Sequence, residues 1–180
     1  MERELEVKLI NIDLADFKRE LLKNGASLTH HEKQENILIS SKTEKIICGS
    51  DYMRIRLVKD MLSGKSYNYL TYKKMVEDSE FKRAEEYTIQ FDDLSNLKKI
   101  LEFIKLDSFE STFKERFSYS YKNIRIDFDY WDRNSFPFDY AEIEANSEEE
   151  LIEFLNEYNI SRENISSKSI KELREEYKGI

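Results

Sequence analysis

Charged and apolar residues alternate at the start of the chain. The segment ELEVK places Glu4, Glu6 and Lys8 at every second position, with Leu5 and Val7 between them. Successive side chains of a β-strand point to opposite faces, so this pattern predicts a strand with one charged and one aliphatic face. The same alternation predicts six further strands, near residues 52–59, 67–75, 83–91, 113–122, 123–130 and 141–145, and another strand is expected near residues 34–40.

Apolar residues at helical spacing predict four helices between and after these strands. They cover residues 14–24, residues 92–105, a segment that starts at Ser147, and residues 169–178. The last two begin with capping boxes, Ser147 with Glu150 and Ser169 with Glu172. This order of elements is typical of an α+β fold dominated by antiparallel hairpins. The apolar sheet faces need cover, so the helices are expected to pack outside the sheet, and the acidic face of the last helix is expected to be solvated.

Composition limits the class of protein. The chain has 180 residues, which suits one domain over residues 1–180, and only four Gly and one Pro, which leaves no obvious linker. A single cysteine cannot form an internal disulfide, and no apolar stretch reaches the roughly 18 residues of a membrane span. The net charge of -8 argues against a general nucleic-acid surface. A cytoplasmic protein with no membrane and no nucleic-acid partner is therefore predicted.

If the predicted sheet closes into a barrel, its charged faces meet in one lumen. The acids in that lumen are Glu4, Glu6, Glu86, Asp127, Asp129, Glu142 and Glu144. The bases are Lys8, Arg54, Arg56, Lys73, Lys114, Arg116 and Arg125. So many charges are costly to remove from water unless they pair with one another or with a ligand.

The mixture of charges indicates the kind of ligand. Clustered Arg and Lys suit a polyphosphate, because Arg offers forked contacts and Lys a point charge. Clustered carboxylates suit Mg²⁺ or Mn²⁺, hard cations that bridge to phosphate oxygens. Together they predict a site for a metal-bound triphosphate. The alternative is an ion-pair network that neutralises itself and binds no ligand.

The ordered set of charged segments resembles the CYTH superfamily, the triphosphate tunnel metalloenzymes. The segments that carry the resemblance are Glu4-x-Glu6-x-Lys8, Arg54-x-Arg56, the lysine Lys73 of TYKK, FKERFSY, IDFD and YAEIE. The chain length and the terminal SSKSIKELREEY look most like the class IV adenylyl cyclase branch, although Ile170 stands where that branch often has tyrosine. The resemblance implies an α+β fold with an eight-stranded antiparallel closed β-barrel, the triphosphate tunnel, and helices packed outside.

The resemblance also implies a role for each charged residue. The residues expected to act in catalysis are Lys8, Glu6, Lys73 and Asp127. Those expected to bind the triphosphate are Lys8, Arg54, Arg56, Lys73, Lys114, Arg116 and Arg125. Those expected to hold Mg²⁺ or Mn²⁺ are Glu4, Glu6, Glu86, Asp127, Asp129, Glu142 and Glu144. Two choices stay open. Asp127 and Asp129 both project inward, and Glu86 fits by parity while Glu85 fits nearly as well by sequence.

Two reactions could use such a site. Attack of the ribose 3′-hydroxyl of ATP on the α-phosphorus gives cyclic AMP and pyrophosphate, and the resemblance places this cyclase reaction first. Attack of water on the terminal phosphorus of inorganic triphosphate, thiamine triphosphate or a nucleoside triphosphate makes the protein a triphosphatase. A module that binds polyphosphate or nucleotide without turnover is the third hypothesis. A small-molecule triphosphate is the expected partner, and the resemblance adds a homodimer as an option.

Overall fold

The computed structural model describes residues 2–47, 49–76 and 82–177, and positions 2–4, 76, 82, 83 and 171 by their backbone alone. Within these residues the strands are β1 (Glu2–Leu9), β2 (Ser27–Ser40), β3 (Tyr52–Asp60), β4 (Ser66–Val76), β5 (Lys82–Gln90), β6 (Ser108–Tyr121), β7 (Ile124–Trp131), β8 (Tyr140–Ala145) and β9 (Ile165–Ser166). The helices are α1 (Leu14–Lys23), α2 (Leu94–Phe103), α3 (Glu148–Glu157), the short 3₁₀ helix η1 (Arg162–Asn164) and α4 (Ile170–Tyr177). The predicted α+β class is confirmed.

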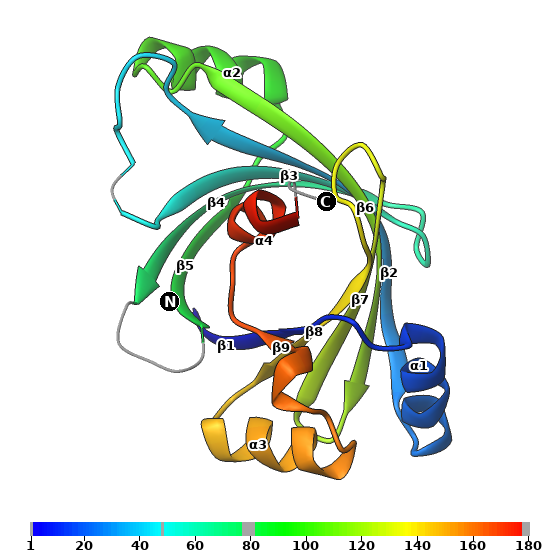
Figure 1. Cartoon of the computed structure of the whole chain (residues 1–180). Helices are drawn as coiled ribbons and strands as arrows, with labels where there is room; N and C mark the ends of the chain where they lie inside the picture. Colours follow the sequence, from blue (N-terminus) through cyan, green and yellow to red (C-terminus); the bar gives the residue numbers. More distant parts are fainter. Residues whose placement is uncertain (1, 48, 77–81, 178–180) are drawn as a thin grey trace.

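The strands form one antiparallel sheet with the order β5-β4-β3-β2-β6-β7-β8-β1-β9. Strand β1 pairs with β8 through residues 5–9 and with β5 through residues 2–6, so the strand order returns to β5. Figure 1 shows the strands curving around the position of α4. The sheet has nine strands, whereas the resemblance implies eight, because β9 adds a short strand beside β1. Strands β2 and β6 are also longer than predicted, at 14 residues each.

Three helices cover the outer, apolar face of the sheet. Helices α1 and α3 pack on one cluster through Phe17, Leu21, Leu151 and Phe154, which meet aliphatic and aromatic residues of β1, β6, β7 and β8. Helix α2 packs through Leu101 on a second cluster that holds isoleucines of β2 and β3. These helices lie outside the strands in Figure 1, as the alternating pattern predicts.

Helix α4 departs from this arrangement. Its Leu173 is fully buried in a third cluster with Trp131 and Tyr140, which lie on the same strand faces as the charged residues. Arg174 fixes the helix further by donating to Glu110 on β6 at 3.0 Å and to the backbone carbonyl of Ser135. The expectation that all helices pack outside is therefore wrong for α4, which lies within the curve of the strands in Figure 1.

Among the described residues, no helix combines the length and the apolar character needed to cross a membrane. The expectation of a single domain over residues 1–180 stays a prediction. The predicted capping box at Ser169 is confirmed, because Glu172 accepts a hydrogen bond from the Ser169 backbone and Ser169 accepts one from the Glu172 backbone. This cap starts α4 where the chain enters the curve of the sheet.

Candidate functional site

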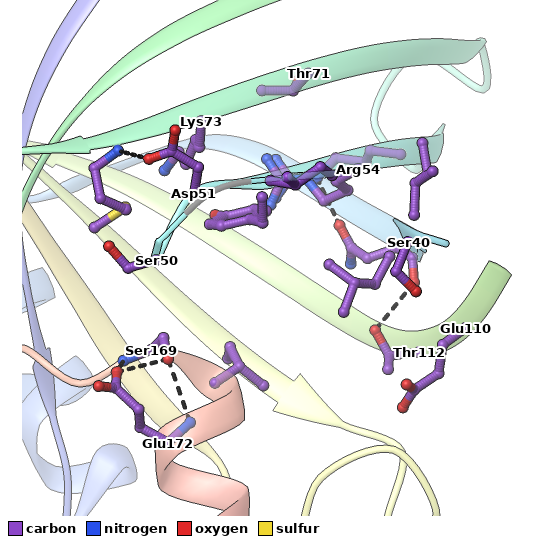
Figure 2. Close-up of a pocket in the computed structure, with 18 of the residues that line it drawn as sticks. Ser40, Ser50, Asp51, Arg54, Thr71, Lys73, Glu110, Thr112, Ser169 and Glu172 are labelled. Carbon is purple, nitrogen blue, oxygen red and sulfur yellow. Dashed lines mark hydrogen bonds between the residues drawn. The ribbon is translucent and has the colours of Figure 1, made fainter. Parts of the chain in front are cut away.

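The charged faces of the strands line a cavity of about 1490 Å³. In Figure 2, Arg54, Thr71 and Lys73 come from the β3–β4 side, and Ser169, just before α4, and Glu172 on α4 lie across the cavity from them. The cavity is therefore bounded by strands on most sides and by the C-terminal helix on another. Predicted residues that line it are Glu6, Lys8, Arg54, Arg56, Lys73, Glu86, Lys114, Arg116, Arg125, Asp127, Glu142 and Glu144.

Arg116 on β6 is the centre of a buried ion-pair network. Its guanidinium donates to both oxygens of Asp129 at 2.6 Å, to Asp127 at 2.6 Å and to Glu142 at 2.5 Å. Lys114 also donates to Asp129 at 2.5 Å. Burial alone would lower the pKa of Arg116, but Asp127, Asp129 and Glu142 outweigh it and raise that pKa well above the ordinary value. Arg116 is therefore held as a cation by three carboxylates.

This network separates the two aspartates that the sequence left open. Asp129 has no solvent exposure, lies behind Lys114 and Arg116 and does not line the cavity. Asp127 does line it, two residues earlier on the same face of β7. Burial opposes ionisation of Asp127, but Arg116 and Arg125 outweigh it and lower the pKa of Asp127. Of the two, only Asp127 presents a carboxylate to a molecule in the cavity.

Lys8 on β1 lies between two acids of the cavity. Its Nζ is 3.3 Å from Glu142 and 3.6 Å from Glu6, and the residue is only 1% exposed. The strand register places Glu6 directly opposite Glu144 and Asp127 directly opposite Glu142. Like charges in opposite positions repel each other unless a cation lies between them. Lys8 and Arg116 provide positive charge beside these acids.

Lys73 on β4 pairs with Glu86 on β5 at 2.6 Å, and both line the cavity. The neighbouring Glu85 does not line it; that residue lies 3.8 Å from the mostly exposed Lys74. The period of two along a strand explains the difference, because adjacent residues point to opposite faces. Glu86, not Glu85, therefore belongs to the cavity.

Arg54 and Arg56 on β3 present a different arrangement. Within the part of the chain that the structure describes, neither arginine forms an ion pair with a carboxylate. Arg56 donates through Nε to the side-chain oxygen of Asn36 at 2.8 Å, and the Arg54 guanidinium lies 6.0 Å from the ring centre of Tyr52. Burial, with added repulsion from Arg54 and Arg116, lowers the pKa of Arg56 to about 9. These two cations would gain from a negatively charged ligand.

The oxygen donors in the cavity suit a hard divalent cation. Glu6 and Glu144 face each other across β1 and β8, and Asp127 and Glu142 face each other across β7 and β8. Carboxylate oxygens from neighbouring strands are what Mg²⁺ and Mn²⁺ prefer. In the present arrangement no three His, Cys, Asp or Glu side chains of the described residues are grouped as a metal site. The side chain of Glu4, another predicted ligand, lies outside the described residues.

Several residues of the cavity were missed by the sequence analysis. They include Asn36, Tyr69, Thr88, Tyr140 and residues of α4 such as Glu172 and Glu175. Tyr140 could have been found, because it has the same strand parity as Glu142 and Glu144. The α4 residues carry no comparable signal, because the position of that helix depends on packing between distant segments.

Comparisons with known proteins agree with the family resemblance of the sequence. The family model for the CYTH domain matches residues 2–174. A search of curated proteins gave no significant match. Similar solved structures include the PH1819 protein of Pyrococcus horikoshii OT3, with 21% identity, a TM-score of 0.75, and coverage of 96% of this chain and 98% of that chain.

Two other similar structures carry names that mention an activity. One, a candidate adenylate cyclase from Vibrio parahaemolyticus, has 14% identity and a TM-score of 0.73, with 97% of this chain and 98% of that chain covered. HpAC1 from Hippeastrum, described as revealing a dominant triphosphatase activity, has 17% identity and a TM-score of 0.68, with 98% and 96% covered. At these identities the likeness shows a shared fold.

Proposed function

The chain belongs to the CYTH family of triphosphate-processing proteins, and we propose that it is a metal-dependent enzyme that cleaves a linear triphosphate bound in the cavity. In this proposal the sheet forms a closed tunnel, and the triphosphate lies along its charged interior. The protein is expected to act in the cytoplasm, and a homodimer remains an option.

The observation that carries this proposal is the pair of arginines on β3. Arg54 and Arg56 line the cavity and form no ion pair with a carboxylate of the described residues. A half-buried cation without a counterion is unfavourable, and a triphosphate supplies several negative oxygens in one molecule. Arginine binds such oxygens through two parallel N–H donors. A cavity that neutralised itself fully would not keep these two cations unpaired.

Other residues are assigned supporting roles. We assign Lys8 and Lys73 to phosphate oxygens, because both line the cavity as ammonium groups, held in place by their ion pairs with Glu142 and Glu86. Lys114, Arg116 and Arg125 would complete the positive surround. Glu86 fixes Lys73 by its 2.6 Å ion pair and would hold the lysine in position for the ligand.

The acids at the junction of β1, β7 and β8 are assigned to the metal. Glu6, Glu142, Glu144 and Asp127 have the right donor chemistry, and Glu4 would join them. When bound, Mg²⁺ or Mn²⁺ would neutralise phosphate oxygens and favour attack at phosphorus. Asp129 is not assigned to the metal, because Lys114 and Arg116 occupy its oxygens inside the wall.

Both reactions predicted from the sequence use this arrangement, and we propose that hydrolysis dominates over formation of cyclic AMP. Two points support this order. Ile170, at a position where the cyclase branch often has tyrosine, lines the cavity and has no polar group for a nucleoside. The fold relative HpAC1 is described as having a dominant triphosphatase activity. Conversion of ATP to cyclic AMP and pyrophosphate, which the sequence resemblance placed first, is the second candidate.

The test is to incubate the protein with tripolyphosphate, ATP or thiamine triphosphate, each with Mg²⁺ or Mn²⁺, and to assay phosphate and cyclic AMP separately. Phosphate release is expected to exceed cyclic AMP formation. The Glu6→Gln and Lys8→Met variants are expected to lose at least about 90% of the turnover, since catalytic electrostatic contacts typically contribute a hundredfold or more. Binding without any product would identify a binding module instead.

The neighbouring glutamates of β5 provide a matched control. Glu86→Gln removes the carboxylate that holds Lys73 in the cavity, so turnover is expected to fall. Glu85→Gln changes the adjacent position on the opposite face and is expected to leave turnover unchanged. Equal activity of the two variants would contradict the assignment of the cavity as the active site. So would the absence of both products and of any thermal shift with tripolyphosphate.

A further inference from the structure

Four residues that line the cavity each keep a hydrogen-bond donor without a partner. Among the described residues that line the cavity, the buried donor atoms without a partner are Nδ2 of Asn36, Nε of Arg54, Nε1 of Trp131 and the hydroxyl of Tyr140. Three of these residues are uncharged, and each is more than nine-tenths buried, with Tyr140 at 0% exposure. Buried polar groups are nearly always paired in folded proteins. Three unpaired neutral donors in the lining of one cavity therefore call for an explanation.

The three neutral donors, in Asn36, Trp131 and Tyr140, all lack the same kind of partner, a hydrogen-bond acceptor. Trp Nε1 can only donate, and Asn36 already uses its side-chain oxygen to accept from Arg56, which leaves its Nδ2 as the free group. The Tyr140 side chain is fully buried, and its hydroxyl carries a hydrogen that it can donate. The missing partner is an acceptor, and a phosphate oxygen is an acceptor.

The two aromatic donors are held in place by other rings. Trp131 and Tyr140 have ring centroids 6.1 Å apart, and Phe136 contacts both, at 5.4 Å from Trp131 and 5.8 Å from Tyr140. Lys114 Nζ lies 5.0 Å from the Trp131 ring, and Lys8 Nζ lies 5.9 Å from the Tyr140 ring. The two aromatic donors thus lie beside two cations that are assigned to phosphate.

We propose that Trp131 and Tyr140 form a neutral donor subsite that binds phosphate oxygens of the triphosphate between Lys114 and Lys8, and that Asn36 donates to the same ligand from its place beside Arg56. This inference rests on the proposed function, since the ligand is the triphosphate assigned to the same cavity. The subsite would position the phosphate chain by hydrogen bonds of fixed direction, which lysine ammonium groups on flexible stems do not provide. Trp131 would both pack against its aromatic neighbours and donate to the ligand.

The test compares two tyrosines that differ in their hydroxyl partners. Tyr140→Phe removes a buried hydroxyl that has no partner, so the unfolding temperature of the ligand-free protein is expected to stay or rise. Affinity for tripolyphosphate, measured by calorimetry in EDTA, is expected to fall roughly threefold to tenfold, as for one lost hydrogen bond. Tyr121→Phe is the control, because its hydroxyl donates to Glu157 at 2.7 Å outside the cavity. That variant is expected to lose stability and keep its affinity.

A second variant tests the subsite without relying on the change in affinity of Tyr140→Phe alone. Trp131→Phe removes Nε1 and keeps an aromatic ring, and it is expected to raise the KM for tripolyphosphate hydrolysis by a similar factor with little change in kcat. Wild-type affinity in both variants would overturn the subsite while leaving the proposed function intact. Failure of the wild-type protein to bind or hydrolyse tripolyphosphate would instead overturn the proposed function on which the subsite depends.

Discussion

The cavity has two walls that hold arginine in opposite ways. On the wall of β6, β7 and β8, Arg116 contacts three carboxylates at 2.5–2.6 Å, and every acid it contacts is buried or half-buried. On the wall of β3, Arg56 donates to the neutral Asn36 and, within the described residues, has no acid as a partner. The pKa of Arg116 is raised above its ordinary value, whereas that of Arg56 is lowered to about 9.

The difference separates a structural charge from a charge available to a ligand. A buried arginine that is fully paired contributes to the stability of the wall, because removing it would leave carboxylates uncompensated. A half-buried arginine such as Arg56, without a counterion among the described residues, adds a cost to folding that a bound anion can remove. The alternating sequence pattern places both residues on the charged face of their strands. Their surroundings, however, assign Arg116 mainly to the fold and Arg56 mainly to the ligand.

Loss of Arg116 is expected to have the largest effect on the free energy of unfolding. The Arg116→Met variant leaves Asp127, Asp129 and Glu142 without their shared cation, and breaking such a buried network typically costs about 3–5 kcal/mol. Urea unfolding followed by circular dichroism measures this change in the free energy of unfolding. A loss below about 1 kcal/mol, the range of an exposed ion pair, would show that the network does not stabilise the wall.

The β3 arginines should respond in the opposite way. Arg54→Gln and Arg56→Gln are each expected to weaken tripolyphosphate binding by about 1.5–3 kcal/mol, the range of a hydrogen bond to a charged group, with little change in unfolding free energy. Calorimetry and urea unfolding on the same samples give both values. Arg133→Gln is a matched control, because Arg133 is largely exposed and pairs with Asp139 outside the cavity. Destabilisation of Arg56→Gln equal to that of Arg116→Met would remove the distinction between the walls.

Strand parity alone predicted much of this cavity. The period of two along each strand places Lys8, Arg54 and Lys73 on one face, and the structure places all three in the lining of the cavity. Parity cannot choose between Asp127 and Asp129, which share a face of β7. The choice depends on depth, because Lys114 and Arg116 cover Asp129 while Asp127 stays at the surface of the cavity.

Parity also gives no information about which charges are paired. The pairs that separate Arg116 from Arg56 join residues from different strands, so they depend on register and on side-chain reach. The position of α4 was missed for a related reason. Its amphipathic pattern resembles that of the outer helices. Its burial against Trp131 and Tyr140 depends on contacts between residues that are more than 25 positions apart in the chain.

A pH titration sharpens the comparison at Lys114. Burial, with repulsion from Arg116, lowers the pKa of Lys114 to about 7, although Asp129 partly offsets this. Because the unfolded chain keeps a higher pKa, the unfolded state binds more protons between pH 7 and 10, and the ligand-free protein should become more stable as pH rises through that range.

Ligand affinity should change in the other direction over the same range. A bound triphosphate favours the charged lysine, so binding takes up a proton above pH 7 and the affinity falls by at most about tenfold per pH unit. Lys114→Met should flatten both slopes, which calorimetry and urea unfolding at pH 7, 8 and 9 would detect. Unchanged slopes in this variant would assign the titration to another group.

The smallest expected effect is at the edge of the paired wall. Arg125 donates to Asp127 at 3.0 Å, as Arg116 does at 2.6 Å, but the Arg125 side chain is 47% exposed and reaches water. Water screens this pair, so Arg125→Gln should cost less than about 1 kcal/mol of unfolding free energy. Urea unfolding alongside Arg116→Met measures the ratio of the two effects. If the losses were equal, contact with Asp127 alone would decide stability; a large ratio would show that burial of the whole network is what makes Arg116 structural.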